Sequence, residues 1–299
     1  MKEGLERKMK MDEKDWILLK ILHEEQSVTK TAERLFTSQP SITYRLNKIE
    51  EIFGIELFTK RHKGITFTAE GEHLVAYARR MLQELQDTKD HISNLSKEVQ
   101  GHLRLGVSSN FAQYKLPKLL REFSTMYPNV QYSVQTGWST DVMKLLDAGI
   151  VQVGILRGSH RWKGVEERLT REKLHIISKK PITIEQLPFL PFIKYKTDAS
   201  LKTIIEDWMH TNLKQAPIIA MEVDRQETCK EMVKHGLGYS IAPEICLQES
   251  DHLYTMELYN AKGKPLMRDT WLMYDQKSLG IKLVKAFIDF LKGEQMVTI

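Results

Sequence analysis

The most constraining feature of this chain is the segment at residues 29 to 71, in which apolar residues recur first at helical spacing and then in alternation. Two short helices are predicted there, joined by a tight turn at Phe36 and Thr37. Ser38 can cap the second helix, and Pro40 is tolerated because the first turn of a helix leaves its N–H groups unpaired anyway. The order of elements predicts a winged helix-turn-helix.

The second predicted helix has two different faces. One is an apolar stripe at spacings of four, three and four, formed by Ile42, Leu46, Ile49 and Phe53. The other carries hydroxyl, amide, phenol and cationic groups, which can bond base edges and phosphates in a DNA major groove. An ordinary solvated helix face is the simpler alternative. The DNA contacts expected from this helix and the hairpin after it are Ser38, Gln39, Pro40, Ser41, Thr43, Tyr44, Asn47, Lys48, Arg61 and Lys63.

A basic hairpin is predicted after this helix. Residues 57–60 and 65–68 alternate in polarity around a tip at 61–64, where Gly64 supplies the permissive backbone that a tight turn requires. Such a tip can reach into a neighbouring minor groove. The alternative is an exposed hairpin whose basic residues serve solubility.

Net charge by itself gives no indication of DNA binding. The chain carries +5 overall, but its first 100 residues hold 17 basic and 17 acidic side chains, so the surplus lies entirely in the remainder. Locally, residues 28–64 contain seven Lys or Arg against four Asp or Glu. A modest basic cluster of this kind can contact phosphates.

The sequence lacks the common catalytic motifs that can be recognised from the spacing of their residues. No glycine-rich phosphate loop follows a strand, HExxH and GxSxG do not occur, and the ten histidines are scattered, so neither an enzyme nor catalytic residues are expected. Cys229 and Cys246 have no CxxC spacing, and no metal ion or cofactor is expected. Redox sensing by these two thiols is an alternative. Without a hydrophobic signal segment or a long apolar run, we expect a cytoplasmic protein with no membrane partner.

A long helix is predicted from Thr68, with Glu70 and Glu72 in its first turn, where the helix dipole favours anions. Its apolar residues alternate four and three apart, which is a narrow heptad seam that suits a partner helix. A helix packed on its own domain usually needs a wider stripe. The seam residues expected to form a homodimer are Leu74, Ala78, Met81, Leu85, Ile92 and Leu95.

Beyond residue 101 strands and helices alternate, which predicts repeated βα winding. A first set is expected at residues 102–109, 116–127, 130–136, 140–148 and 151–156. A second set is expected at residues 174–179, 191–195, 201–212, 218–223, 227–234 and 238–243. Two α/β lobes are implied, and a strand at 270–274 and a helix at 279–291 are expected after them.

The strand ends of such lobes predict a ligand site, because open α/β sheets bind at the carboxyl ends of their strands. The residues expected there are Ser108, Ser109, Asn110, Thr136, Gly137, Arg157, Thr197, Ser200 and Asp224. Helix capping explains each hydroxyl equally well. Arg157 suits an anionic group, while Asp224 could bind an amine or position Arg225, so an anion or a zwitterion is the expected ligand.

A specific spacing supports the DNA-binding interpretation of residues 15–71. It runs through Thr31-Ala32, Leu35, Ser38-Gln39-Pro40, Ile42-Thr43, Leu46, Ile49-Glu50, Gly54, Leu57-Phe58, Thr68 and Gly71. This spacing resembles that of the DNA-binding domain of LysR-type transcriptional regulators. The departures are small: Thr31 replaces a second alanine, Thr43 a serine, and Lys60 and Lys63 arginines. Tyr44 stands where a basic residue is frequent, so operator preference does not carry over from relatives.

The resemblance covers almost the whole chain, with weaker motifs after residue 100. It implies a winged helix-turn-helix at 1–68, of which 1–10 form a flexible extension, a linker and dimerisation helix at 69–100, and an effector-binding domain at 101–299. That domain would be α/β and like a two-lobed periplasmic binding protein, with lobe I at about 101–162 and 266–299 and lobe II at about 163–265.

In function, the resemblance implies a LysR-type transcription regulator that binds double-stranded promoter DNA and responds to a small-molecule effector between its lobes. Such regulators pair their linker helices in an antiparallel manner, so a homodimer or a dimer of dimers is expected. A redox-sensing regulator that uses Cys229 and Cys246 is one alternative. A two-lobed solute-binding protein is another.

Overall fold

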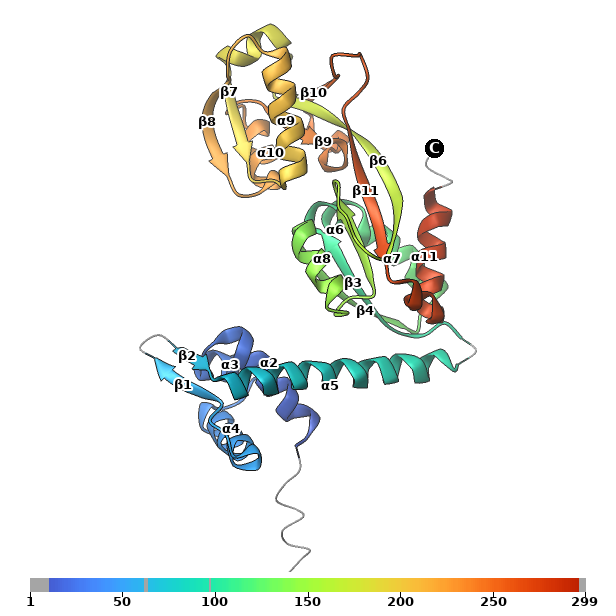
Figure 1. Ribbon diagram of the computed structural model, residues 1–299. Coiled ribbons are helices and arrows are strands. Elements are labelled where there is room, and N and C mark those ends of the chain that lie inside the picture. The colour runs from blue at the N-terminus through green and yellow to red at the C-terminus, as the bar shows by residue number, and fades with distance from the viewer. Residues whose placement is uncertain (1–10, 62–63, 97, 296–299) are drawn as a thin grey trace, which may run out of the picture. The chain divides into compact units, whose positions relative to one another are not determined.

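The computed structural model describes residues 11–61, 64–96 and 98–295, and the chain divides into two compact units, Met1–Ile92 and Ser93–Ile299 (Figure 1). The extension expected at residues 1–10 lies outside the described residues. Each unit has its own hydrophobic core. In the described ranges, no helix has the length and apolarity needed to cross a membrane.

The first unit is a winged helix-turn-helix. Its elements are α2 (Glu13–Glu25), α3 (Val28–Arg34), α4 (Gln39–Phe53), β1 (Phe58–Arg61), β2 (Gly64–Phe67) and the beginning of α5 (Ala69–Asn94). The predicted cap is confirmed, since the Ser38 hydroxyl accepts the N–H of Ser41 at 3.4 Å. Pro40 lies in the first turn of α4, where it interrupts no hydrogen bond.

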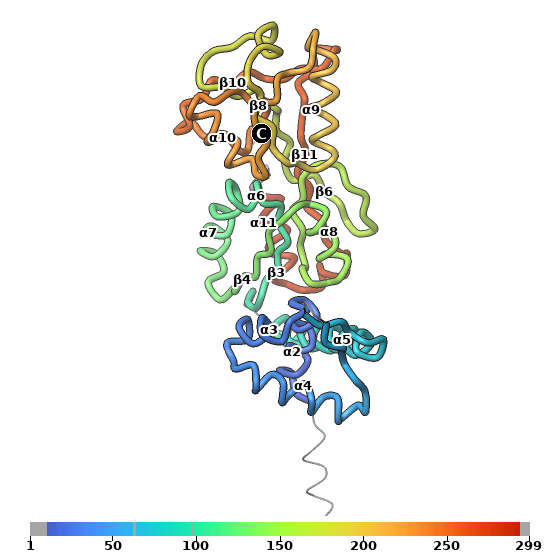
Figure 2. Tube along the Cα trace, turned by 90° about the vertical axis from the view of Figure 1, so that its left-hand side faces the viewer, coloured from blue at the N-terminus to red at the C-terminus, as the bar shows by residue number. Residues whose placement is uncertain are grey.

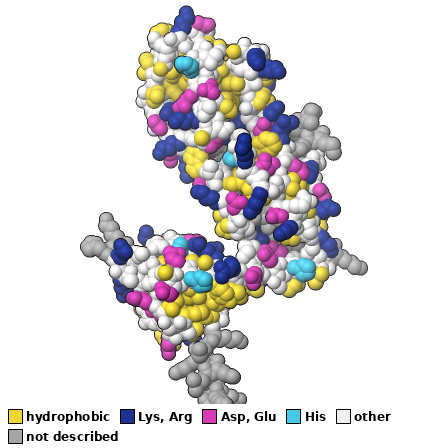
Figure 3. Space-filling model, viewed as in Figure 1, with side chains coloured by type: hydrophobic (Ala, Val, Ile, Leu, Met, Phe, Trp, Pro, Cys, Tyr) yellow, Lys and Arg dark blue, Asp and Glu magenta, His cyan; other side chains and the backbone are white. Residues whose placement is uncertain are grey.

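The core of this unit confirms most of the predicted apolar stripe of α4. Ile42, Leu46 and Ile49 are buried against Leu18, Leu19 and Leu22 of α2. The prediction for Phe53 is wrong, because its side chain is 43% exposed. Phe53 is the last residue of α4 and lies at the edge of the core. Together with Trp16 and Tyr77, it lines an apolar groove of about 800 Å³. Figure 3 shows apolar side chains gathered on this part of the first unit.

The hairpin of β1 and β2 is anchored to the end of α2. Its strands pair antiparallel from Phe58 opposite Phe67 to Arg61 opposite Gly64. Gly64 has a φ of +98°, and a Cβ there would lie 2.5 Å from the carbonyl oxygen of Gln26. The same carbonyl accepts the N–H of the next residue at 3.0 Å. Glycine is therefore required by both conformation and close approach.

The second unit consists of two α/β lobes joined by β6 (Val165–Ser178) and β11 (Met267–Tyr274), as Figures 1 and 2 show. Lobe I contains β3 (Gly101–Ser108), α6 (Ser109–Tyr114), α7 (Leu116–Met126), β4 (Val130–Gly137), α8 (Ser139–Asp147), β5 (Val153–Arg157) and α11 (Lys282–Gln295). Lobe II contains β7 (Pro191–Tyr195), α9 (Ala199–Asn212), β8 (Ile218–Val223), α10 (Gln226–Lys234), β9 (Ser240–Pro243) and β10 (Tyr254–Glu257). The short η2 (Glu244–Cys246) follows β9.

The sheet order explains how two strands connect the lobes. In the larger sheet the order is β10-β6-β11-β5-β3-β4, and β9 also pairs with β6. Residues 165–173 of β6 pair with β11, whereas residues 174–178 pair with β9 and β10 of lobe II. The register shifts between Thr270 and Trp271, which leaves Leu169 of β6 as a bulge. Strands β3, β4 and β5 are parallel to one another, and so are β7 and β8.

Candidate functional site

The polar face of α4 is open to solvent. Tyr44 and Asn47 are exposed, Lys48 is half-buried, and the apolar face opposite them is buried. The other predicted contacts from this segment are exposed as well: Ser38, Gln39, Pro40, Ser41 and Thr43. One helix therefore presents hydroxyl, amide, phenol and cationic groups together, which is the chemistry that reads a DNA groove.

Phe36, which the sequence analysis placed in the turn but not among the DNA contacts, is also part of this surface. It lies in the turn before α4, has a φ of +51°, and is 98% exposed. Its backbone is held by hydrogen bonds, since the N–H of Phe36 donates to Glu33 and that of Thr37 to Ala32. An apolar side chain held outward beside the polar helix can contact a thymine methyl group.

The basic cluster is smaller than the sequence count indicated. Arg34 pairs with Glu24 and Glu25, each at 2.8 Å. Arg45 pairs with two carboxylates of the α2 amino terminus, at 3.2 and 3.5 Å. Arg61 is exposed at the end of β1, whereas Lys63 lies outside the described residues. The positive charge available to phosphates is thus concentrated on fewer residues than seven.

The predicted dimerisation seam of α5 divides into two parts. Leu74 and Ala78 are buried in the core of the first unit, so their assignment to a dimer interface is wrong. The physical reason is that the first turns of α5 complete the core beneath α2. Met81 is half-buried, and Leu85 and Ile92 are exposed; Leu95 is exposed as well, but it follows the end of α5 at Asn94 and so is not on the helix.

The second unit contains a cavity of about 440 Å³ at the carboxyl ends of its strands. Eight of the nine predicted ligand residues line it: Ser108, Ser109, Asn110, Thr136, Gly137, Arg157, Thr197 and Asp224. The ninth, Ser200, does not line it, because it lies in the first turn of α9 beside Gly158. Lobe I supplies the ends of β3, β4 and β5, and lobe II supplies those of β7 and β8.

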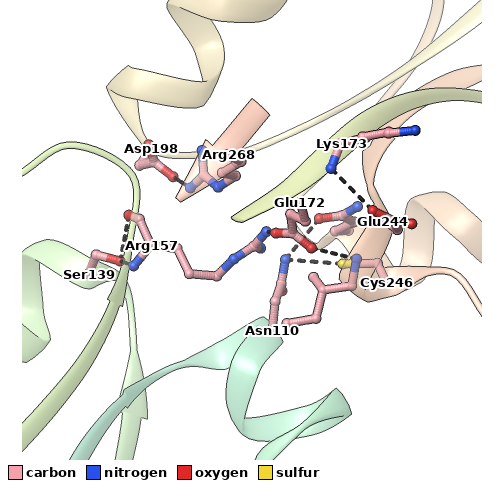
Figure 4. A network of polar contacts seen from close by, with 11 residues as sticks. Asn110, Ser139, Arg157, Glu172, Lys173, Asp198, Glu244, Cys246 and Arg268 are labelled. Carbon is pink, nitrogen blue, oxygen red and sulfur yellow. Dashed lines mark hydrogen bonds and ion pairs between the residues drawn. The ribbon is translucent and has the colours of Figure 1, made fainter. Parts of the chain in front are cut away.

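Arg157 is not a free cation in this cavity, which corrects the sequence-based expectation. Its side chain is only 3% exposed and pairs with Glu172 of β6 (Figure 4). Glu172 also accepts the N–H of Ile245 at 2.6 Å. The hydroxyl of Ser139 bonds both backbone polar groups of Arg157, at 3.0 and 3.1 Å. Burial, followed by the nearby charge of Arg268, lowers the pKa of Arg157 to about 10, so it stays charged at neutral pH.

Arg268 is the second buried cation of the cavity, and sequence reasoning missed it. It lies on β11, directly opposite Glu172 in the strand register, and its Nη2 donates to Asp198 (Figure 4). Asp198 also accepts the N–H of Leu201 at 3.0 Å and so caps α9. Burial alone would raise the pKa of Asp198, but the charge and hydrogen bond of Arg268 hold it below its usual value.

Two further predicted ligand residues have other roles in the structure. The amide of Asn110 donates to Gln226 Oε1 at 2.9 Å and to Cys246 Sγ at 3.4 Å, so it bridges α6 to lobe II. Asp224 is 72% exposed and its nearest cationic partner is Arg225, at 3.9 Å. Water screens a carboxylate this exposed, which weakens the case for an amine site.

Both cysteines are buried, and burial raises the pKa of each thiol. The pKa of Cys229 rises to about 11 and that of Cys246 to about 12. A reactive thiol needs a low pKa and access to solvent. Within the described residues there is also no group of three His, Cys, Asp or Glu side chains placed to hold a metal ion.

Two family models together match most of the chain. Residues 14–72 match the bacterial regulatory helix-turn-helix protein model of the lysR family, and residues 96–295 match the LysR substrate binding domain. The HTH-type transcriptional regulator YkuM of Bacillus subtilis (strain 168), itself uncharacterized, is 37% identical over 277 residues, which are 92% of this chain and 94% of that protein.

Solved structures share the fold. Full-length CbnR, crystallised with its target DNA, has a TM-score of 0.67 at 19% identity and covers 95% of this chain and 99% of its own. The full-length Vibrio cholerae virulence activator AphB has a TM-score of 0.62 at 18% identity, with the same coverage. Together with the family models, these observations show that the chain belongs to the LysR family of bacterial helix-turn-helix transcriptional regulators.

Proposed function

We propose that this LysR-family regulator binds double-stranded promoter DNA through α4 and the β1–β2 hairpin, and that a small anionic effector in the cavity of the second unit modulates that binding. The effector-binding part of this proposal is supported mainly by the cavity itself. It is built from the strand ends of both lobes, where hydroxyl, amide and guanidinium groups converge. A ligand that contacts both lobes can favour one arrangement of them over another.

The DNA half is supported by the exposure of one polar helix face. Tyr44, Asn47 and Lys48 project from a helix whose opposite side is anchored in a core, so the face is rigid and available. CbnR, which has the same fold, was crystallised with its target DNA.

Assembly as a homodimer, or as a dimer of dimers, is supported by α5. Once Leu74 and Ala78 are assigned to the core, the exposed part of the seam on α5 still contains Leu85 and Ile92, which are seven residues apart. Apolar residues exposed at that spacing favour a partner helix. Two copies also place two recognition helices on two half-sites.

The structure favours an effector over the redox alternative. Cys229 is 1% exposed and Cys246 is fully buried, and their raised pKa values leave almost no thiolate at neutral pH. The cavity, by contrast, is large enough for a small organic molecule.

The DNA half is tested by operator binding. An operator is first selected from a pool of random duplexes with the full chain, and its affinity is measured by fluorescence anisotropy across a range of salt concentrations. Alanine at Tyr44, Asn47 and Lys48 together is expected to weaken binding at least tenfold. Lys48→Ala alone should lower the salt slope by about one unit, because one phosphate contact is lost.

The matched control is Lys118→Ala, which removes an exposed cation from α7 of the second unit. It is expected to leave operator affinity and salt slope unchanged. A triple variant with normal thermal stability and unchanged operator affinity would remove α4 from the proposed interface.

A further inference from the structure

Phe36 occupies a backbone position that suits glycine better than an aromatic residue. It follows Leu35, the last residue of the α3 cap, and two hydrogen bonds fix its place. Its own N–H donates to the carbonyl of Glu33 at 3.1 Å, and the N–H of Thr37 donates to the carbonyl of Ala32 at 3.0 Å. This pair of bonds is the Schellman motif, which ends many helices and usually has glycine where Phe36 stands. The φ of Phe36 is +51°, in the left-handed region that is unfavourable for a residue with a Cβ.

The side chain of Phe36 does not offset this backbone strain by packing. Phe36 is 98% exposed, so its ring lies in water and contributes almost nothing to the core of the first unit. Glycine or asparagine at this position would relieve the strain and would also remove the exposed apolar surface. A local strain that the fold itself does not require is an observation from which a function can be inferred.

Phe36 lies beside the end of α4 that is expected to enter a groove of DNA. It stands two residues before the cap Ser38, so their Cα atoms are at most about 7.6 Å apart. Every residue from Phe36 to Ser41 is exposed, and recognition helices contact base edges mainly with their first residues. Because the two turn bonds hold the backbone, the Cα–Cβ bond of Phe36 has a fixed direction, and contact with DNA would order little of the chain.

The chemistry of the major groove indicates what a phenyl ring would contact there. Among the groups by which the groove distinguishes base pairs, the C5-methyl group of thymine is apolar, and the others are hydrogen-bond donors and acceptors. A phenyl ring cannot pair with a donor or an acceptor in the plane of a base, but it packs against a methyl group. Phe36 thus adds an apolar contact to a surface whose other exposed groups are mainly polar.

We propose that Phe36 contacts the C5-methyl group of a thymine in each operator half-site, and that this contact makes the regulator prefer thymine at that position. The inference rests on the proposed function, and it adds a residue from the turn between α3 and α4 to the contacts made by α4 and the hairpin. Burial of one methyl-sized group changes affinity about fourfold.

The contact is tested with deoxyuridine, which differs from thymidine by the absence of the C5-methyl group. The affinity of the full chain is measured by fluorescence anisotropy, at fixed salt concentration, for the selected operator. The measurement is repeated for duplexes in which each thymine of one half-site is replaced in turn. At the thymine that contacts Phe36, the replacement should weaken binding of the unaltered chain about fourfold.

Two variants remove the ring. Phe36→Asn should weaken binding of the thymine operator at least about tenfold, because both half-sites lose the contact, and should abolish the difference between thymine and uracil at that one position. Phe36→Gly should do the same. Both variants should melt at or above the temperature of the unaltered chain, measured by circular dichroism, since both residues tolerate the left-handed region and no packing is lost.

The matched control is Phe189→Asn, which removes an exposed phenyl ring from the second unit. Phe189 is the last residue of the short η1 (Ile184–Phe189) and is 69% exposed. The control is expected to leave unchanged both the operator affinity and every difference between thymine and uracil.

Three results would overturn the contact. They are an operator in which every thymine can be replaced without loss, unchanged affinity in Phe36→Asn, and lower affinity in Phe36→Asn with every thymine–uracil difference retained. The last result would mean that the ring packs on the sugar–phosphate backbone or on a second copy of the chain. The triple alanine variant of α4 separates this inference from the proposed function. If that variant loses affinity while Phe36→Asn does not, only the thymine contact fails; if the unaltered chain selects no operator, the proposed DNA-binding function fails.

Discussion

The polar face of α4 and the cavity of the second unit use similar side chains in opposite ways. On α4 the polar groups come from one helix, are exposed, and stand on a buried apolar stripe. In the cavity they come from several elements, and its two buried arginines are already paired, Arg157 with Glu172 and Arg268 with Asp198. A substitution on α4 therefore removes only its own side chain's contacts, whereas a substitution of a paired residue in the cavity also leaves its buried partner without a counter-charge.

A substitution in the cavity should destabilise the protein far more than a substitution on the polar face of α4. Arg157→Ala leaves Glu172 buried and unpaired, and should lower the free energy of unfolding of the second unit by about 3–5 kcal/mol. Tyr44→Ala should change the stability of the first unit by no more than about 0.5 kcal/mol. Urea denaturation followed by tryptophan fluorescence and by circular dichroism measures both.

The matched control for that contrast is Arg157→Met combined with Glu172→Gln. It removes both charges but keeps an acceptor for the N–H of Ile245, so it should recover most of the lost stability. Equal losses in the single and double variants would show that packing, not an unpaired charge, dominates this site.

The two parts of α5 should respond differently to an introduced charge. Leu74→Glu places a charge in the core of the first unit and should unfold it, whereas Leu85→Glu with Ile92→Glu should leave the fold intact and dissociate the dimer. Sedimentation velocity and circular dichroism distinguish these outcomes. An intact dimer in the double variant would place the interface elsewhere.

The smallest expected effect is a pH dependence confined to the second unit. Burial lowers the pKa of His175 from its usual 6.5, aided by Lys173 and opposed by Glu244 and Glu257. The unfolded chain therefore takes up the proton first, so stability should fall as the pH drops below about 6.5 and be flat above it. His175→Leu should remove this slope, because neither ring nitrogen has a partner. A slope that persists in His175→Leu would assign it to other groups.

The helix-turn-helix could be predicted in detail because its signals are local. Ser38, Pro40 and the apolar spacing of α4 lie within a few turns of chain, and each contributes its own constraint. Phe53 and Leu74 were assigned wrongly because the pattern shows which residues are apolar, not where a core ends or which partner covers them.

The cavity could be predicted only in part. The ends of strands were recognisable, so residues such as Ser108 and Thr136 were expected at one edge of the sheet, and both line the cavity. Arg268 and Glu172 escaped notice because they meet only through the pairing of β11 with β6, almost a hundred residues apart in sequence. The interaction that ties up the Arg157 side chain is likewise non-local, and charge alone does not show whether a cation is free.

The ladder between β6 and β11 has a mechanical consequence. Eight paired positions fix the register of the two strands, and a slip by one residue would turn every side chain to the opposite face. Sliding of one lobe past the other along these strands would break that register, whereas torsion of the part that is only two strands wide, residues 267–269 with 171–173, would keep it. The bulge at Leu169 adjoins this two-stranded part and increases the local twist, a few residues from Glu172. A structural change transmitted from the cavity through these strands would thus alter the angle between the two lobes rather than shift one lobe along the other.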